Sequence, residues 1–335
     1  MLSTPVSNMN NYLIKLNSKI FEKFEILDYI GSGSESKVFK VKEKKSNKMV
    51  TMKMINKQKG EKKNLNEYII SHKLKHMNVI DYYGAIEIKK EELDCMIIEY
   101  AKFGNLREFQ KNIIQKNYLS ETLLCFITYQ ILKGLKYIHM CKIAHLDLKP
   151  QNIIINDYLN VKIIDFSVSL SYSKIKTKEI QLPLVGTSFY MAPEIVWNKT
   201  IKVKDLNKVD LFSLGVILYN LAFDEYPFDL DYEDIKNIEV ISEKYKRKLK
   251  INNEGENNSS CFIDFIKKLL ETDINKRINI NQALDDYWVK GAHILNNEKE
   301  NIFLAENFLR YLITDHIKSF DDYIKKKNKI KIINN

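Results

Sequence analysis

The chain has 335 residues, which is room for one large domain or two of ordinary size. Hydrophobic residues make up 45% of it and charged residues 29%, so the chain can build a sizeable core and is not wholly disordered. The formal net charge of +10 would suit a nucleic-acid binder, but Lys far outnumbers Arg, which base-reading proteins favour, so we interpret the charge as solvated, lysine-rich faces.

Cysteine spacing and the termini indicate a reducing compartment. The four cysteines lie far apart, show no metal-ligand spacing and are expected to be reduced and mostly buried: Cys95, Cys125, Cys141 and Cys261. Residues 1–19 lack the apolar run of a signal peptide, and Leu2 excludes N-myristoylation. The longest apolar run, 211–223, is too short for a bilayer and is typical of a buried core helix. We therefore expect no membrane span and a cytoplasmic or nuclear location.

The first predicted elements are a leader and a strand. Residues 1–23 are polar and are expected to form a leader with one short helix. From Phe24 the pattern alternates, and Phe24, Ile26 and Ile30 are expected to share one face of a strand.

A glycine-rich stretch, Gly31-Ser-Gly33-Ser-Glu-Ser36, follows this strand. Glycines let backbone N–H groups close over a phosphate. The residues from Val38 to Val41 are β-branched, aromatic or basic, which predicts a second strand and not the helix of a dinucleotide-binding fold. By itself this stretch also fits a plain hairpin turn.

One lysine stands inside the next predicted strand, 49–55. Burying Lys53 among apolar residues would be costly without a partner. Glu67 supplies a carboxylate on a predicted helix, where Glu67, Ile70 and Leu74 fall at helical spacing. Exposed positions for both charges are the alternative to a buried Lys53.

Further apolar segments alternate with polar ones. A further strand is predicted over 95–100, and a long apolar helix begins at the N-cap candidate Ser120. Another core helix is predicted over 262–270. Residues 291–335 are predicted to contain an amphipathic helix that packs on the protein instead of binding a membrane, because its polar face carries acidic as well as basic side chains.

Two aspartates flank a pair of short apolar runs, 153–155 and 161–164. Asp147 lies on a loop before the first run, and Asp165 follows the second. Loop residues held by a buried scaffold often carry catalysis. Lys149 offers a charge for a phosphate, and Asn152 offers an amide oxygen for a hard cation such as Mg²⁺. An Asp–Lys salt bridge in an ordinary turn would produce part of the same pattern.

The order and spacing of these motifs resemble those of eukaryotic protein kinases over residues 24–290. The segment from Gly186 to Glu194 resembles the end of a kinase activation segment, Arg277 is the expected partner of Glu194, and Asp210 resembles the residue that anchors the catalytic loop. The resemblance implies an α+β, bilobal fold.

The resemblance also implies a domain organisation. A strand-rich N-lobe would occupy 24–100 and a helical C-lobe 101–290. Residues 1–23 would remain a leader, and 291–335 a basic, helical C-terminal extension.

The family implies ATP and Mg²⁺ as cofactors, and protein Ser/Thr hydroxyls as acceptors, with no nucleic-acid partner. Asp147 would take or orient the hydroxyl proton, and Asn152 with Asp165 would hold the metal. The resemblance also implies that Glu67 pairs with Lys53 and that the two position the phosphates. The implied catalytic residues are Lys53, Glu67, Asp147, Lys149, Asn152 and Asp165. The implied nucleotide contacts are Gly31, Gly33, Ser36, Val38, Lys53, Glu99, Ala101 and Ile154.

Several positions depart from the family pattern. Ser36 and Ser167 replace glycines, Thr51 replaces an alanine, and Ser71 replaces an apolar residue. Ser167, Thr51 and Ser71, together with Leu146, keep open a pseudokinase that binds partners without catalysis, and the basic charge keeps open a nucleic-acid binder. Neither the oligomeric state nor the physiological substrate follows from the sequence.

Leu146 stands where the family usually has an Arg that binds a phosphate on the activation segment. Leu carries no charge and donates no side-chain hydrogen bond. We therefore expect this segment to be held by packing or by a partner, and not strictly by phosphorylation.

Overall fold

The computed structural model describes residues 18–32, 36–56, 66–88, 93–114, 119, 121–156, 160–247, 249, 251 and 258–290. The predicted cap at Ser120 and the predicted helix within 291–335 lie outside these residues. The described chain divides into two units. The small unit contains 18–76 and 80–100, and the large unit contains 77–79 and the residues from 101 on.

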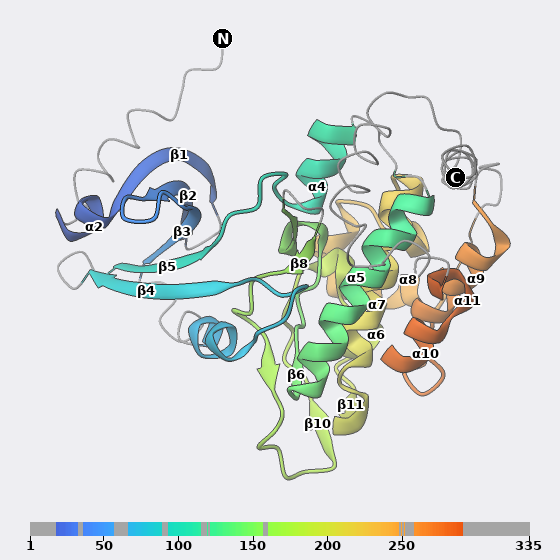
Figure 1. Ribbon diagram of the computed structural model, residues 1–335. Helices are drawn as coiled ribbons and strands as arrows, with labels where there is room; N and C mark the ends of the chain where they lie inside the picture. The colour runs from blue at the N-terminus through green and yellow to red at the C-terminus, as the bar shows by residue number, and fades with distance from the viewer. Residues whose placement is uncertain are drawn as a thin grey trace, which may run out of the picture. The chain divides into compact units, whose positions relative to one another are not determined.

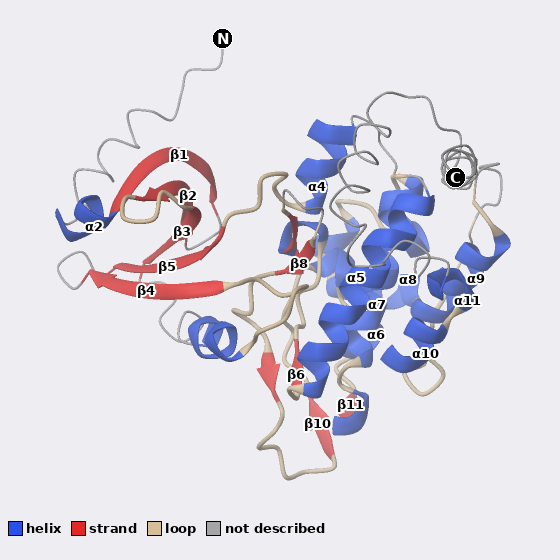
Figure 2. Cartoon of the chain, in the orientation of Figure 1, coloured by secondary structure: helices blue, strands red, loops and turns tan. Residues whose placement is uncertain are grey.

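The small unit is a five-stranded antiparallel sheet in the order β1-β2-β3-β5-β4 (Figures 1 and 2). Its elements are α2 (Ser18–Lys23), β1 (Phe24–Ser32), β2 (Ser36–Glu43), β3 (Met49–Asn56), β4 (Tyr82–Ile88) and β5 (Leu93–Glu99). A helix also covers the described residues 66–73. The predicted strands over 49–55 and 95–100 are present. β-Branched and other apolar side chains on β2, β3 and β5 fill one core.

The expected face of the first strand was wrong for Ile30. The pairing of β1 with β2 shifts register between Ile26 and Asp28 and again between Tyr29 and Gly31. Each shift changes which residues point inward, so Tyr29 packs on the core beside Ile26 while Ile30 is exposed.

The core of the small unit begins before β1. Ile20 of α2 is fully buried in the same cluster as Phe24 and Phe39. The backbone N–H of Lys44 donates to the carbonyl of Lys23, which ties the end of α2 to the β2–β3 turn. The helix expected in the leader therefore belongs to the small unit.

The large unit is mainly helical. Its helices are α4 (Leu106–Glu108), α5 (Glu121–Met140), α6 (Pro193–Val196), α7 (Lys208–Phe223), α8 (Ile238–Tyr245), α9 (Ser260–Leu269), α10 (Ile280–Asp285) and α11 (Tyr287–Lys290). A π-helical turn, η2 (Phe109–Ile114), follows α4, and short 3₁₀ turns are η3 (Pro150–Asn152), η4 (Ser188–Tyr190), η5 (Val203–Asp205), η6 (Pro227–Asp229) and η7 (Asp234–Lys236).

Three short antiparallel strand pairs accompany these helices. They are β6 (Ile143–Ala144) with β9 (Leu170–Ser171), β7 (Ile153–Ile155) with β8 (Val161–Ile163), and β10 (Glu179–Gln181) with β11 (Thr200–Lys202). The combination of a sheet-based unit and a helical unit confirms the expected α+β fold class.

Helix α7 is the apolar centre of the large unit. Its residues from Val209 to Ala222 are all buried. Among the described residues, the segment Val203–Phe223 has the length and apolar character to cross a membrane. Of the 18-residue stretch that gives it this character, 83% is buried inside the protein. A helix covered on all sides is expected to be apolar all round, so this segment is a core helix.

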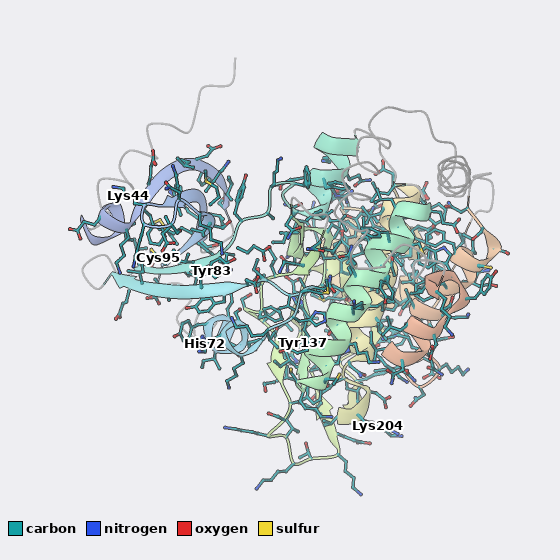
Figure 3. All side chains as sticks on the ribbon, viewed as in Figure 1. Lys44, His72, Tyr83, Cys95, Tyr137 and Lys204 are labelled. Atoms are coloured by element: carbon teal, nitrogen blue, oxygen red, sulfur yellow. The ribbon has the colours of Figure 1, made fainter. Side chains whose placement is uncertain are left out.

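The cysteines are free, as expected, but not all are buried. Cys95, labelled in Figure 3, lies in the small core, where burial and then the charge of Asp94 raise the pKa of its thiol to about 12. Cys125 is buried, Cys141 is exposed and Cys261 is partly exposed. Cys141 is exposed because α5 ends at Met140 and the cysteine falls in the turn that follows.

An ion pair is buried in the large unit. Arg277 donates to both carboxylate oxygens of Glu194, at 2.7 and 2.9 Å, and to the carbonyls of Glu271 and Lys208. Its guanidinium also lies 4.9 Å from the ring centre of Phe212. The pair expected from the sequence is therefore present, with its charges compensated.

Replacing Arg277 with Met should lower the free energy of unfolding by about 3–5 kcal/mol, because Glu194 would be left as an uncompensated buried charge. Urea unfolding of the full chain measures this loss. Lys236→Met, which breaks the exposed Lys236–Glu233 pair, is the control and should have little effect. A loss below about 1 kcal/mol for Arg277→Met would contradict the assignment.

Candidate active site

A buried carboxylate fixes the loop that follows β6. Asp210 of α7 accepts hydrogen bonds from the backbone N–H of His145 and of Leu146, each at 2.9 Å. Nε2 of His139 lies 2.8 Å from the same carboxylate. Burial alone would raise the pKa of Asp210, but the hydrogen bond and charge of His139, with a smaller effect of His145, lower it below its usual range. Asp210 is therefore an anion, and His139 Nε2 must donate to it.

The buried carboxylate of Asp210 also affects the pKa of Tyr172, which contacts the backbone of His139. The Tyr172 hydroxyl donates to the His139 carbonyl at 3.2 Å. Burial and then the nearby charge of Asp210 raise the pKa of Tyr172 to about 12, so it remains a hydrogen-bond donor at neutral pH.

Asp147 is held by three side chains. Its Oδ1 accepts a hydrogen bond from the Thr187 hydroxyl at 2.7 Å. Its Oδ2 lies 2.8 Å from Lys149 Nζ and 3.1 Å from Asn152 Nδ2, which also donates to the Asp147 carbonyl. Lys149 additionally donates to the Thr187 hydroxyl at 2.8 Å. The carboxylate thus has a fixed orientation and an oxygen that faces a hydroxyl.

The β7–β8 pair brings Asn152 and Asp165 to one end of the ladder. Ile153 pairs with Ile163, and the backbone N–H of Ile164 donates to the Asn152 carbonyl at 3.0 Å, so Asp165 follows directly. Asp165 adopts a left-handed backbone conformation, with φ of 66°. Mg²⁺ in proteins binds oxygen ligands such as carboxylate and amide oxygens, and completes its coordination with water and phosphate oxygens. The Asn152 nitrogen already serves Asp147, which leaves its amide oxygen for a cation.

The small unit carries its own charged pair. Lys53 Nζ of β3 donates to both oxygens of Glu67, each at 2.8 Å, and Glu67 is buried. Lys53 is opposite Val38 in the β2–β3 register. The expected pair is present, and the two departures nearest to it in sequence, Thr51 and Ser71, are buried.

The expected nucleotide contacts lie in both units. In the small unit, Gly31 pairs with Val38 across β1 and β2, Ser36 begins β2, and Glu99 ends β5. A side chain at Gly31 would meet nothing within 4 Å in the described chain. Gly33 lies outside the described residues.

In the large unit, Ala101 precedes α4, and its carbonyl accepts from the N–H of Gly104 at 3.2 Å. Ile154 is the buried middle residue of β7.

Backbone contacts anchor the chain between Asp165 and Glu194. β9 pairs with β6, and the N–H of Tyr172 donates to the Lys142 carbonyl. Further along, β10 pairs with β11 through three residue pairs, and the N–H of Val203 donates to the Lys178 carbonyl. A two-strand ladder therefore holds the middle of this segment.

Leu146 also contacts this segment. Its side chain is buried, and its carbonyl lies so near Gly186 that an added Cβ would come within 2.6 Å of it. Gly186 has a φ of 103°, a conformation that favours glycine. Residue 146 thus contacts this segment through its backbone carbonyl, at a position where the family usually has a phosphate-binding Arg.

His139 is the residue that sequence reasoning missed. It occupies a buried position on α5, where a histidine in an apolar face is a weak signal. Its Nδ1 is buried without a hydrogen-bond partner in the described chain, so only Nε2 is engaged. The helical pattern of α5 gave no indication that Asp210, on another helix, would be its partner.

Comparisons with known proteins agree on one family. A family model described as protein kinase domain matches residues 24–289. Serine/threonine-protein kinase dst2 of Dictyostelium discoideum is 30% identical over 293 residues, which is 87% of this chain and 24% of that protein. The probable serine/threonine-protein kinase fhkA of the same organism is 31% identical over 89% of this chain and 56% of its own length.

A plant protein gives a similar result. CBL-interacting serine/threonine-protein kinase 14 of Arabidopsis thaliana is 30% identical over 82% of this chain and 60% of its own length. The chain thus spans from 24% to 60% of the length of these three relatives.

Replacing Asp210 with Asn should destabilise the protein by about 1–3 kcal/mol at pH 7, because an amide cannot accept from all three donors. Since the pKa of Asp210 is lower in the folded state, its stabilising effect is present above the usual value of 3.8 and is lost as the pH falls through the lowered pKa.

Urea unfolding as a function of pH measures this difference between wild type and variant. The difference should persist from pH 7 to about pH 4 and shrink below it. Asp264→Asn, an exposed change on α9, is the control. A gap between wild type and Asp210→Asn that stays constant down to roughly pH 3 would show that the charge of Asp210 is not what matters.

Proposed function

Since the chain belongs to the protein kinase family, on its Ser/Thr branch, we propose that it transfers the γ-phosphoryl group of ATP to Ser or Thr hydroxyls of protein substrates, with Mg²⁺ as cofactor. The observation that carries this proposal is the hydrogen bond from the Thr187 hydroxyl to Asp147 Oδ1. It supports a carboxylate that is already oriented to accept from an aliphatic hydroxyl.

In the proposed reaction, the substrate oxygen attacks the γ-phosphorus, and the bond from that phosphorus to the β–γ bridging oxygen breaks. ADP leaves with that oxygen, and the hydroxyl proton passes to Oδ1 of Asp147. Lys149, 2.8 Å from the other Asp147 oxygen, holds the carboxylate in place and offers a positive charge to the transferred group.

The donor set fits the cation that the family implies. Asn152 and Asp165 would hold Mg²⁺, which supplies charge neutralisation on the phosphate oxygens. Lys53, kept in place by Glu67, would bind the phosphates of ATP. Phosphoryl transfer needs mainly such positioning and neutralisation.

Replacing Asp147 with Asn should reduce phosphoryl transfer by ~10²–10⁴-fold, because the proton acceptor is lost while the shape is kept. Initial rates with ATP, Mg²⁺ and a Ser-containing protein substrate measure this. ATP binding by the same variant, followed by calorimetry, should stay near the wild-type value.

Lys53→Met serves as the contrasting variant, because it should lose turnover by weakening phosphate positioning instead. Activity of Asp147→Asn within a few-fold of wild type would contradict the assignment of Asp147 as the proton acceptor. Complete inactivity of the wild type would instead favour a pseudokinase.

Phosphatase treatment should leave most of the activity, because the segment around Gly186 is anchored by packing on Leu146 and by the β10–β11 ladder. Alanine at Ser171, Ser173 and Thr177 together should have the same small effect. Thr187 is kept in this test, since its hydroxyl contacts Asp147. A rate reduction of ~100-fold or more after dephosphorylation, equal to ~2.7 kcal/mol, would refute the expectation.

A further inference from the structure

Arg107 of α4 is a partly buried cation whose hydrogen-bond acceptors are neutral. Its guanidinium donates to Oε1 of Gln110 at 2.9 Å and to Oδ1 of Asn220, on α7, at 2.6 Å. Both acceptors are buried amides. None of the ion pairs among the described residues contains Arg107. The side chain is therefore held in place while its charge stays uncompensated.

The buried Arg277 provides the contrast. Its guanidinium meets both carboxylate oxygens of Glu194, so the positive charge is balanced inside the protein. A guanidinium stays protonated at every physiological pH, and taking it partly out of water without an anion costs free energy. Local rules of this kind are broken mainly at functional sites. Arg107 is therefore a candidate position for a ligand that supplies the negative charge.

Two acidic residues border this network, and neither pairs with Arg107. The carboxylate of Glu108 is exposed and accepts from the backbone N–H of Asn105, in the capping box of α4. The carbonyl of Glu225 accepts from Asn220 Nδ2 at 3.2 Å, but its side chain is exposed and is absent from the ion pairs of the described chain. A counter-charge for Arg107 would thus come from solvent or from a bound partner.

Arg107 lies near the segment that holds the acceptor site. Burial and then the neighbouring Tyr226 raise the pKa of Tyr190, and the Arg107 guanidinium opposes that rise. Tyr190 ends the 3₁₀ turn η4, and its N–H donates to the carbonyl of Thr187, whose hydroxyl contacts Asp147. Three residues of such a turn span about 6 Å. With the length of the tyrosine side chain added, the guanidinium is within reach of roughly five extended residues of a peptide whose hydroxyl meets Asp147.

We propose that Arg107 forms a subsite for an acidic side chain of the protein substrate, either a carboxylate or a phosphorylated residue, within roughly five residues of the hydroxyl that receives the phosphoryl group. This inference rests on the proposed function. A guanidinium binds carboxylate and phosphate oxygens through paired, charge-assisted hydrogen bonds. The amides of Gln110 and Asn220 hold the guanidinium without neutralising it. A basic substrate side chain at this position would meet like charge.

The test uses the full chain and a set of synthetic peptides. Each peptide has one Thr acceptor in a neutral background, with Glu, phosphoserine, Gln or Lys placed at one flanking position at a time. Values of kcat/KM should be about 10-fold higher for Glu or phosphoserine than for Gln at one position at least, and lower for Lys than for Gln at that position. The preference should weaken as ionic strength rises.

Two variants of Arg107 separate charge recognition from a structural role. Arg107→Gln removes the charge but keeps a hydrogen-bond donor for the two amides, and should lower the ratio of the Glu to the Gln kcat/KM to about one. Arg107→Lys keeps the charge without the planar fork, and should retain part of the preference. Arg247→Gln, which removes an exposed arginine after α8, is the matched control and should retain all of it.

Equal use of the acidic and Gln peptides by the wild type would overturn the proposal, as would a preference for Lys. A Glu-to-Gln ratio that Arg107→Gln leaves unchanged, even at a lower overall rate, would show that Arg107 only joins α4 to α7. A preference for phosphoserine alone would assign the subsite to phosphate.

Fluorescence anisotropy of labelled Glu, phosphoserine and Gln peptides, without ATP, gives a second measurement. If no peptide is phosphorylated, the proposed function fails. Tighter binding of an acidic peptide than of the Gln peptide, lost in Arg107→Gln, would still support the subsite, and equal binding of all three would overturn it.

Discussion

The large unit depends on one buried anion. Taking a carboxylate out of water is expensive unless its oxygens are fully satisfied. Asp210 meets this condition with two backbone N–H groups and the imidazole of His139. These bonds join α7, α5 and the residue just before Asp147 at a single point, so the packing of helices fixes the backbone before Asp147, while Lys149, Asn152 and Thr187 orient its carboxylate.

The segment between Asp165 and Glu194 is ordered in a similar way. Its two strand pairs use backbone groups, and at Gly186 its backbone lies against the carbonyl of Leu146. Such contacts form as the chain folds and require no added charge. An Arg at position 146 would offer the same backbone carbonyl and would add a phosphate-dependent contact, since a guanidinium binds a phosphate strongly and a leucine does not.

Much of the fold and of the candidate site could be predicted from the sequence. Strands β3 and β5 and helices α7 and α9 have strong apolar patterns. Glu194 and Arg277 could be paired from the sequence because each supplies the opposite charge that the other needs when buried. Lys149 and Asn152, which contact the Asp147 carboxylate, lie in the same short stretch of sequence, whereas Thr187 lies farther along the chain.

Other features could not be predicted, for physical reasons. The inward face of β1 depends on two register shifts that alternation alone does not encode, so Ile30 was misassigned. The His139–Asp210 pair and the β10–β11 ladder join residues far apart in sequence, and strands of three residues carry no useful period. Cys141 is exposed because a helix ends one residue earlier, and helix ends are the least predictable boundaries.

The burial of Ile20 shows that the small core and the match to the family model begin at different residues. The match to the family model starts at Phe24, whereas the residues that fill the core of the small unit start earlier, in α2. A fragment cut at the boundary of recognisable homology would open a hole at the edge of the small sheet and expose apolar surface. The core of the small unit therefore extends beyond the residues that the family model matches.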